Sequence, residues 1–133
     1  METVRVSEDR RVGVRDEGIE YDTSDMARAL DAISNLNGRQ RTVVSLRKGH
    51  LVFTVGGGDD GRYIAFLAVN EDEQFFNLVD READGAKQYE VTTGGQAADF
   101  PARQCIDLQA ARTAATYFLM SGAMNPAQSW EEA

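Results

Sequence analysis

The middle of the chain contains five short segments with strand-like patterns, and the connections between them are too short for parallel pairing. The segments are residues 41–47, 51–55, 62–70, 74–80 and 87–92. A parallel pair needs a crossover of about a dozen residues or more, whereas antiparallel strands can follow each other through tight turns. Lys48-Gly49 and Glu71-Asp72-Glu73 have the composition of such turns. The sequence therefore predicts an antiparallel meander.

Residues 62–70 are expected to form the central strand of this meander. In residues 51–55, the apolar side chains of Leu51, Phe53 and Val55 lie on one face of the predicted strand. Residues 62–70 are instead apolar on both faces, which is typical of a strand that is covered on both sides.

One helical pattern precedes the meander and another follows it. The apolar residues of the first pattern are Met26, Ala29, Leu30, Ile33 and Leu36. Those of the second pattern are Leu108, Ala111, Ala115, Phe118 and Leu119. Both sets recur at helical spacing and follow good N-cap residues, among them Asp107. We expect helices near residues 24–36 and 108–120, with Asn37-Gly38 and Gly122 as their C-terminal caps.

Together these elements predict one α+β domain over residues 1–133. Its mainly antiparallel β-sheet meander is flanked by an N-terminal and a C-terminal helix. Residues 4–6 and 12–14 are short alternating pieces that are expected to be strands. Trp130 is expected to pack back onto the body of the protein, because an exposed indole is unfavourable.

The charge and cysteine content narrow the class of protein. The formal net charge is −8, which argues against direct nucleic-acid binding and suits a basic protein partner. The alternative is that the acidic residues only keep the protein soluble. A single cysteine, Cys105, excludes an internal disulfide, and the longest apolar stretch is residues 64–69. Without a signal-peptide pattern, we expect a cytoplasmic protein that does not contact membranes.

The sequence contains no recognisable set of catalytic or metal-binding residues. His50 and Cys105 are the only residues of their types, and one of each cannot make a standard zinc site. The glycine-rich run at residues 56–61 lacks the Lys-Ser/Thr ending of a phosphate-binding loop, and its two aspartates would repel phosphate. We therefore expect no catalytic residue, no metal and no cofactor, and an enzyme is the weaker class.

Dispersed features of the second half resemble one family of bacterial proteins. These features are Gly56, Tyr89, Gly94-Gly95, Phe100-Pro101, Ile106, Phe118-Leu119, Gly122, Pro126 and Trp130-Glu131-Glu132. In this order they resemble the first-numbered Imm family, whose members are immunity proteins of polymorphic-toxin systems. The resemblance covers residues 51–132. It implies a protein that binds and neutralises a cognate toxin domain, often a nucleic-acid-targeting deaminase or nuclease, by blocking its active-site face.

Acidic residues at the predicted turns are candidates for the toxin contact, with two aromatic residues as anchors. The candidates are Asp59, Asp60, Tyr63, Glu71, Asp72, Glu73, Phe76, Asp80, Glu82 and Asp84. Two other classes remain open: a small-molecule-binding or enzymatic α+β domain with a pocket between helix and sheet, and a structural subunit that dimerises through a sheet edge. A deep pocket with converging polar groups would favour the former.

Overall fold

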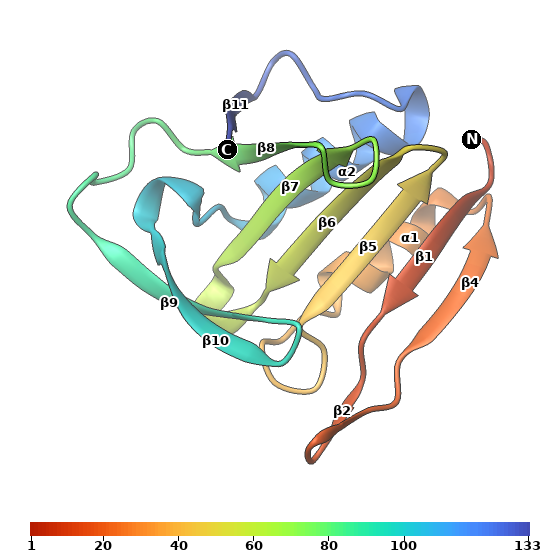
Figure 1. The fold of residues 1–133 in the computed structure, drawn as a ribbon, viewed down its shortest axis with the longest axis horizontal. Helices are drawn as coiled ribbons and strands as arrows, with labels where there is room; N and C mark the ends of the chain where they lie inside the picture. The colour runs from red at the N-terminus through yellow and green to blue at the C-terminus, as the bar shows by residue number, and fades with distance from the viewer.

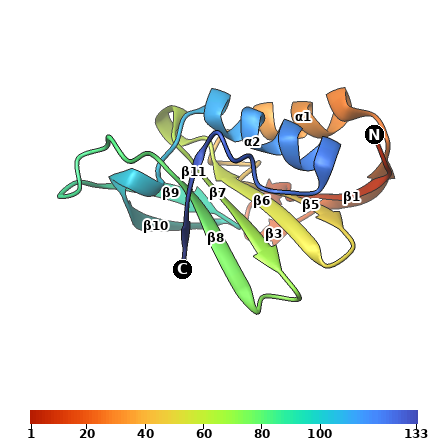
Figure 2. The same cartoon turned by 90° about the horizontal axis from the view of Figure 1, so that it is seen from above.

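The computed structural model describes residues 1–133, and its centre is one antiparallel sheet of seven strands (Figure 1). In sheet order the strands are β11 (Ser129–Glu132), β8 (Gln74–Val79), β7 (Tyr63–Val69), β6 (Leu51–Gly57), β5 (Val43–Lys48), β1 (Val4–Glu8) and β4 (Ile19–Thr23). Both helices, α1 (Met26–Ser34) and α2 (Leu108–Ser121), cover the same face of this sheet (Figure 2). The predicted α+β class is confirmed. The predicted antiparallel meander is also confirmed for four strands, since β5 pairs with β6, β6 with β7 and β7 with β8.

Two small hairpins and two short 3-10 helices complete the fold. The hairpins pair β2 (Arg11–Val12) with β3 (Arg15–Asp16), and β9 (Gln88–Thr93) with β10 (Gln96–Pro101). The 3-10 helices are η1 (Asp59–Gly61) and η2 (Ala102–Gln104). Strand β9 was expected to extend the meander, but it leaves the main sheet. The reason is that β11 occupies the free edge of β8, so β9 pairs with β10 instead.

The hydrophobic core lies between the main sheet and the two helices. Phe53 of β6 stacks on Phe118 of α2, with ring centroids 5.7 Å apart, and both side chains are buried. Ala111, Ala114 and Ala115 are almost completely buried, and their small size lets α2 lie close to the sheet. The predicted apolar faces of both helices therefore point into the core, as their spacing indicated.

The helix ends follow the expected chemistry at three of four positions. Asp25 accepts hydrogen bonds from the backbone N–H groups of Ala27 and Arg28, and Asp107 and Gly122 cap α2. The expected cap of α1 at Asn37-Gly38 is wrong, because α1 ends at Ser34 with Asn35 as its cap. Asn37 instead organises the turn that leads to β5, where its side-chain oxygen accepts three backbone N–H groups.

Trp130 packs back onto the body of the protein, as expected. It is half-buried in β11, where its ring makes an edge contact with Phe53 at a centroid distance of 6.4 Å. Its indole N–H donates to the carbonyl of Asn125 over 2.9 Å. The final strand therefore attaches the end of the chain to the core.

Candidate functional site

The negative charge of the protein is concentrated in one third of the chain. Residues 59–101 contain ten acidic and three basic residues, whereas all other residues together contain 12 acidic and 11 basic ones. This segment runs from η1 through β7 and β8 to the end of β10. The acidic excess is therefore a local property of one side of the fold, which makes solubility alone a weaker explanation for it.

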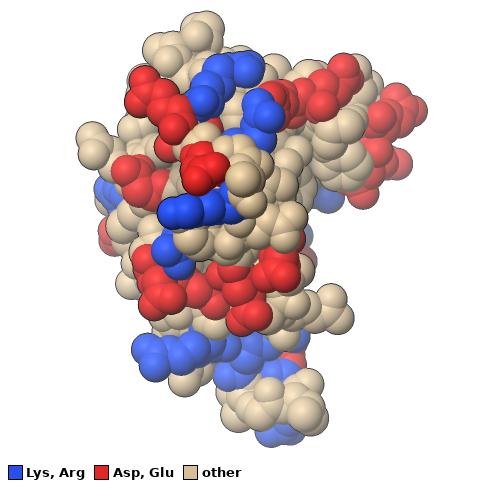
Figure 3. Space-filling model, turned by 90° about the vertical axis from the view of Figure 1, so that its left-hand side faces the viewer, with Lys and Arg blue, Asp and Glu red and all other residues tan.

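The structure separates the predicted acidic residues into two groups. Glu71, Asp72 and Glu73 form the turn before β8, while Asp80 follows its last residue. A strand of six residues spans about 20 Å, so these groups lie at opposite ends of β8. Figure 3, which views the molecule from the side of β9, shows carboxylates in separate groups with basic side chains between them. The candidate acidic residues therefore do not form one continuous acidic surface.

A larger set of acidic residues lies on the side of the fold that contains η1, the end of β8 and the β9–β10 hairpin (Figure 1). Asp60 belongs to it because η1 and residues 80–82 line the same surface hollow. We call this set the acidic end, and it consists of Asp60, Asp80, Glu82, Asp84, Glu90 and Asp99, all of them exposed. The carboxylates of Asp80 and Asp84 also accept the N–H groups of Glu82 and Ala86, which shapes the β8–β9 loop.

Glu90 and Asp99 were not among the sequence candidates, although they are the most unusual pair of this group. They lie directly opposite each other in the β9–β10 hairpin, and both side chains are exposed. Neither takes part in any ion pair of the molecule. Like charges at directly opposed positions destabilise a strand pair, so folding alone does not favour this arrangement.

Three of the sequence candidates have structural positions that limit their availability. Asp59 accepts hydrogen bonds from the backbone N–H and the hydroxyl of Thr92, over 2.9 and 2.8 Å, so it ties η1 to β9. The Tyr63 ring is only 6% exposed and belongs to the core, where burial raises the pKa of its phenol. Phe76 pairs with Leu67 on the helix-facing side of the sheet and is half-buried.

The β9–β10 hairpin lies directly on the open face of the main sheet (Figure 1). Its close approach depends on two glycines of β6, because a Cβ atom at Gly56 or Gly57 would meet Thr93 or Val91. Val91 of β9 is completely buried, so this side of the hairpin packs against the body of the protein. The backbone of Gly57 also has a φ of 108°, which only glycine adopts readily. Strand β6 is thus built to receive the hairpin.

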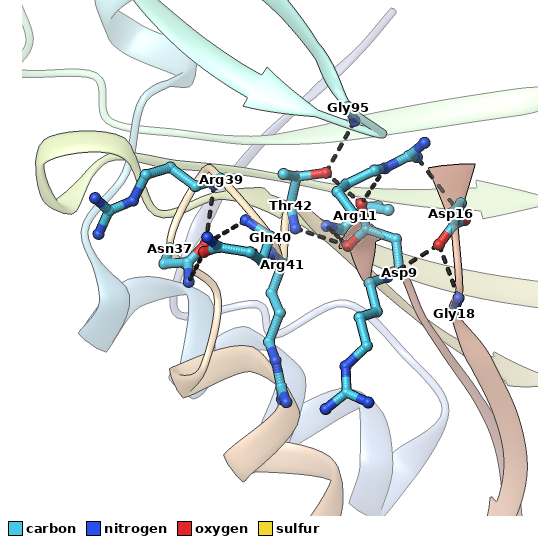
Figure 4. Close-up of polar contacts among 12 residues, drawn as sticks. Asp9, Arg11, Asp16, Gly18, Asn37, Arg39, Gln40, Arg41, Thr42 and Gly95 are labelled. Atoms are coloured by element: carbon cyan, nitrogen blue, oxygen red, sulfur yellow. Dashed lines mark hydrogen bonds and ion pairs between the residues drawn. The ribbon is translucent and has the colours of Figure 1, made fainter. Parts of the chain in front are cut away.

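A buried carboxylate fixes the turn of the same hairpin. Asp9 is 6% exposed and accepts the backbone N–H groups of Thr42 and Val43, over 2.7 and 3.0 Å, as well as the Thr42 hydroxyl. The Thr42 oxygen in turn accepts the N–H of Gly95 over 2.9 Å, so it lies between Asp9 and the hairpin (Figure 4). This chain of hydrogen bonds connects β1, β5 and the β9–β10 turn.

Arg11 completes this network and influences the ionisation of Asp9. Its Nε donates to the Asp9 carboxylate over 3.0 Å. Burial opposes ionisation of Asp9, but the hydrogen bonds from Thr42, Val43 and Arg11 outweigh it and hold the pKa of this carboxyl below its ordinary value. The hairpin that carries Glu90 and Asp99 is therefore anchored at its turn, through Thr42 and Gly95, and along β9.

The arginines near the acidic end are already engaged, whereas Lys87 in the β8–β9 loop is exposed and forms no ion pair. Arg62 lies 3.8 Å from the ring centroid of Tyr89 and 3.9 Å from the Asp60 carboxylate. Arg81 and Arg103 both form ion pairs with Glu131. The carboxylates of Glu82, Glu90 and Asp99 have no such partner, so they are available to cations of another molecule.

The remaining reactive side chains form no group of their own. Burial raises the pKa of the half-buried Cys105 thiol, and nearby Arg62 partly opposes this shift. No three His, Cys, Asp or Glu side chains are close enough to hold a metal ion, and neither helix is long and apolar enough to span a bilayer. The largest hollow lies on the exposed side of α2 around Thr113 and Tyr117, not between helix and sheet.

A sheet with both helices on one face and an anchored acidic hairpin on the other defines an α+β domain without a recognisable catalytic site. Comparison with protein families identifies the class of protein. The model of the family Immunity protein Imm1 matches residues 15–132, so the chain belongs to this family and is an immunity protein. The match reaches further than the resemblance seen from residue 51 onward, because it includes β4 and α1. Comparisons with curated proteins and with solved structures give no match.

Proposed function

We propose that this immunity protein neutralises a nucleic-acid-targeting toxin, such as a deaminase or nuclease, by covering the toxin's active-site face with the acidic end. The observation that carries this proposal is the exposed Glu90–Asp99 pair on an anchored hairpin. A partner with closely spaced Lys or Arg side chains would relieve the repulsion between these carboxylates. A cleft that binds nucleic acid is rich in such cations.

The arrangement of the hairpin supports tight binding. Its anchors at Thr42, Thr92 and Val91 hold the carboxylates in place before the partner arrives. A surface that is already ordered loses less conformational entropy on binding, so more of the interaction energy appears as affinity. Complementary charge also raises the association rate and disfavours wrong partners.

The other residues predicted to contact the toxin have different roles in this proposal. Asp60, Asp80, Glu82 and Asp84 stay in the proposed contact, whereas Asp59 and Tyr63 support the fold beneath it. Glu71, Asp72 and Glu73 form a separate acidic turn at the far end of β8, which a large toxin domain could reach as a second contact. A toxin that acts on nucleic acid meets its target in the cytoplasm, which is where we place its inhibitor.

The test is a pair of matched charge-reversal variants assayed against the cognate toxin domain. E90K/D99K reverses two charges of the acidic end. Residues 90 and 99 still repel each other, now as two cations, so stability should change little. E20K/D31K makes the same change in net charge at exposed positions of β4 and α1. We expect E90K/D99K to lower the association rate at low salt about tenfold or more, and the control to stay near wild type.

Two results would contradict the proposal. Equal losses in both variants would mean that only the overall charge matters. Wild-type association rate, salt dependence and protection of cells in E90K/D99K would mean that the toxin binds elsewhere.

A further inference from the structure

The open face of the main sheet contains a groove whose floor and walls are mainly apolar. Its volume is about 280 Å³, and it is lined chiefly by Ile64, Phe66, Phe75, Asn77, Phe100 and Gln104. Phe66 and Phe75 form the aromatic floor, with ring centroids 6.0 Å apart. Both rings are only half-buried, as is Phe100 on the wall that β10 supplies.

Folding does not account for this exposed aromatic surface. Phe66 and Phe75 face away from the helices, because side chains alternate along a strand and Leu67 of β7 and Leu78 of β8, an odd number of residues away, belong to the core on the other side. The nearby residues Ile64 and Val79 are buried, whereas the surface around Phe66 and Phe75 stays open. Partly exposed aromatic residues in a groove are the usual anchors of a protein interface.

Charge around the groove indicates what kind of segment it would accept. Asp99 directly precedes Phe100 and Glu73 lies two residues before Phe75, and neither carboxylate forms an ion pair. Glu131, which pairs with Asn77 in the sheet, is already bound by Arg81 and Arg103 and is not counted among them. The groove also lies within the segment that contains ten acidic and only three basic residues. An apolar side chain with cationic neighbours would therefore fill the groove while its neighbours meet the surrounding carboxylates.

We propose that this groove holds an aromatic or aliphatic side chain of the toxin that is flanked by Lys or Arg. The inference rests on the proposed function and adds an apolar anchor to it. The acidic end supplies attraction over distance, and the groove supplies the desolvated contact that slows dissociation. The hollow along α2 lacks these features: no carboxylate lines it, and nothing in the structure indicates what covers it.

The experiment measures binding of the purified, catalytically inactivated cognate toxin domain. Phe75→Ala removes half of the aromatic floor, and Asn77→Trp fills the groove without removing any of its apolar lining. Met120→Ala is the control, since Met120 is an apolar residue on α2 that is 70% exposed. We expect Phe75→Ala and Asn77→Trp to raise the dissociation constant about tenfold or more, at low and at high salt, and Met120→Ala to leave it unchanged.

The outcomes separate this inference from the proposed function. If both groove variants bind within about twofold of wild type while E90K/D99K loses affinity, the groove is not a contact and the acidic end remains one. If neither the groove variants nor E90K/D99K changes binding, the proposed function is wrong as well. If Phe75→Ala is also less stable by thermal unfolding, Asn77→Trp decides, because it keeps the aromatic floor intact.

Discussion

Asp9 is the residue whose ionisation matters most for the candidate site. Its carboxylate joins β1, β5 and, through Thr42, the turn of the β9–β10 hairpin. A buried aspartate within an arginine-rich stretch gave no signal in the sequence, because its partners Thr42 and Val43 are more than 30 positions away. Local patterns do not reveal such pairs.

Asp9→Asn should lower the free energy of unfolding by about 2–3 kcal/mol at pH 7, the cost of disrupting hydrogen bonds to a buried charged group. The pKa of Asp9 is lowered in the folded protein, so its contribution is complete above the unfolded pKa of about 3.9 and is lost as the pH falls through the folded pKa. Urea denaturation of the wild type and of Asp9→Asn between pH 7 and pH 3 measures this contribution to the free energy of unfolding.

The difference between wild type and Asp9→Asn should therefore shrink toward pH 3. Asp31→Asn is a suitable control, since Asp31 is exposed on α1, and it should change stability by less than about 0.5 kcal/mol. A difference for Asp9→Asn that stays constant over this pH range would show that ionisation of Asp9 contributes nothing to stability.

At the scale of elements, the decisive contact is between β6 and the β9–β10 hairpin. Gly57→Ala should cost at least about 2 kcal/mol, because it combines an unfavourable φ of 108° with a Cβ atom 2.6 Å from the carbonyl oxygen of Arg62 and 2.8 Å from Val91. Gly49→Ala is the matched control. Its φ is also positive, at 60°, but its Cβ would lie in open space, so about 1 kcal/mol is expected.

Chemical denaturation of both glycine variants provides the measurement. Equal costs at the two positions would mean that the hairpin yields easily and is not held firmly on β6. Gly57→Ala should also weaken toxin binding if the hairpin must be ordered before the partner arrives.

The elements that local patterns define were predictable, and those that depend on distant partners were not. The alternation in residues 51–55 and the helical spacing around Phe118 record burial on one face, so they identified β6 and α2. Strand β10 was missed because its polar and small residues, such as Ala97 and Ala98, show no alternation. Strand β11 has only four residues, and its place beside β8 depends on a contact across about 50 positions.

The candidate site shows the same limit. The acidic excess was visible in the sequence, but the separation of the candidate acidic residues into two groups at opposite ends of β8 was not. The Glu90–Asp99 pair could have been found. Gly94-Gly95 is a typical two-residue hairpin turn, and counting outward from it places these two acids opposite each other. Recognition of that turn as a hairpin was the missing step.

At the scale of the whole molecule, both helices cover one face of the sheet (Figure 2), and both edge strands carry acidic residues. The outer strand β4 carries Glu20 and Asp22, and the outer strand β11 carries Glu131 and Glu132. Charged edge strands disfavour edge-to-edge pairing of two copies. This arrangement argues against the dimer alternative and agrees with the proposed toxin contact through the acidic end and the groove.

Hydrogen–deuterium exchange of the full chain, alone and with the inactivated toxin domain, tests this surface most directly. The account predicts slower backbone exchange on binding in residues 80–101 and in the open-face strands β7 and β8. Exchange in α2 and in β4 should stay unchanged, because these elements face away from the proposed contact. Protection confined to α2 or to β4, with residues 80–101 exchanging as in the free protein, would contradict it.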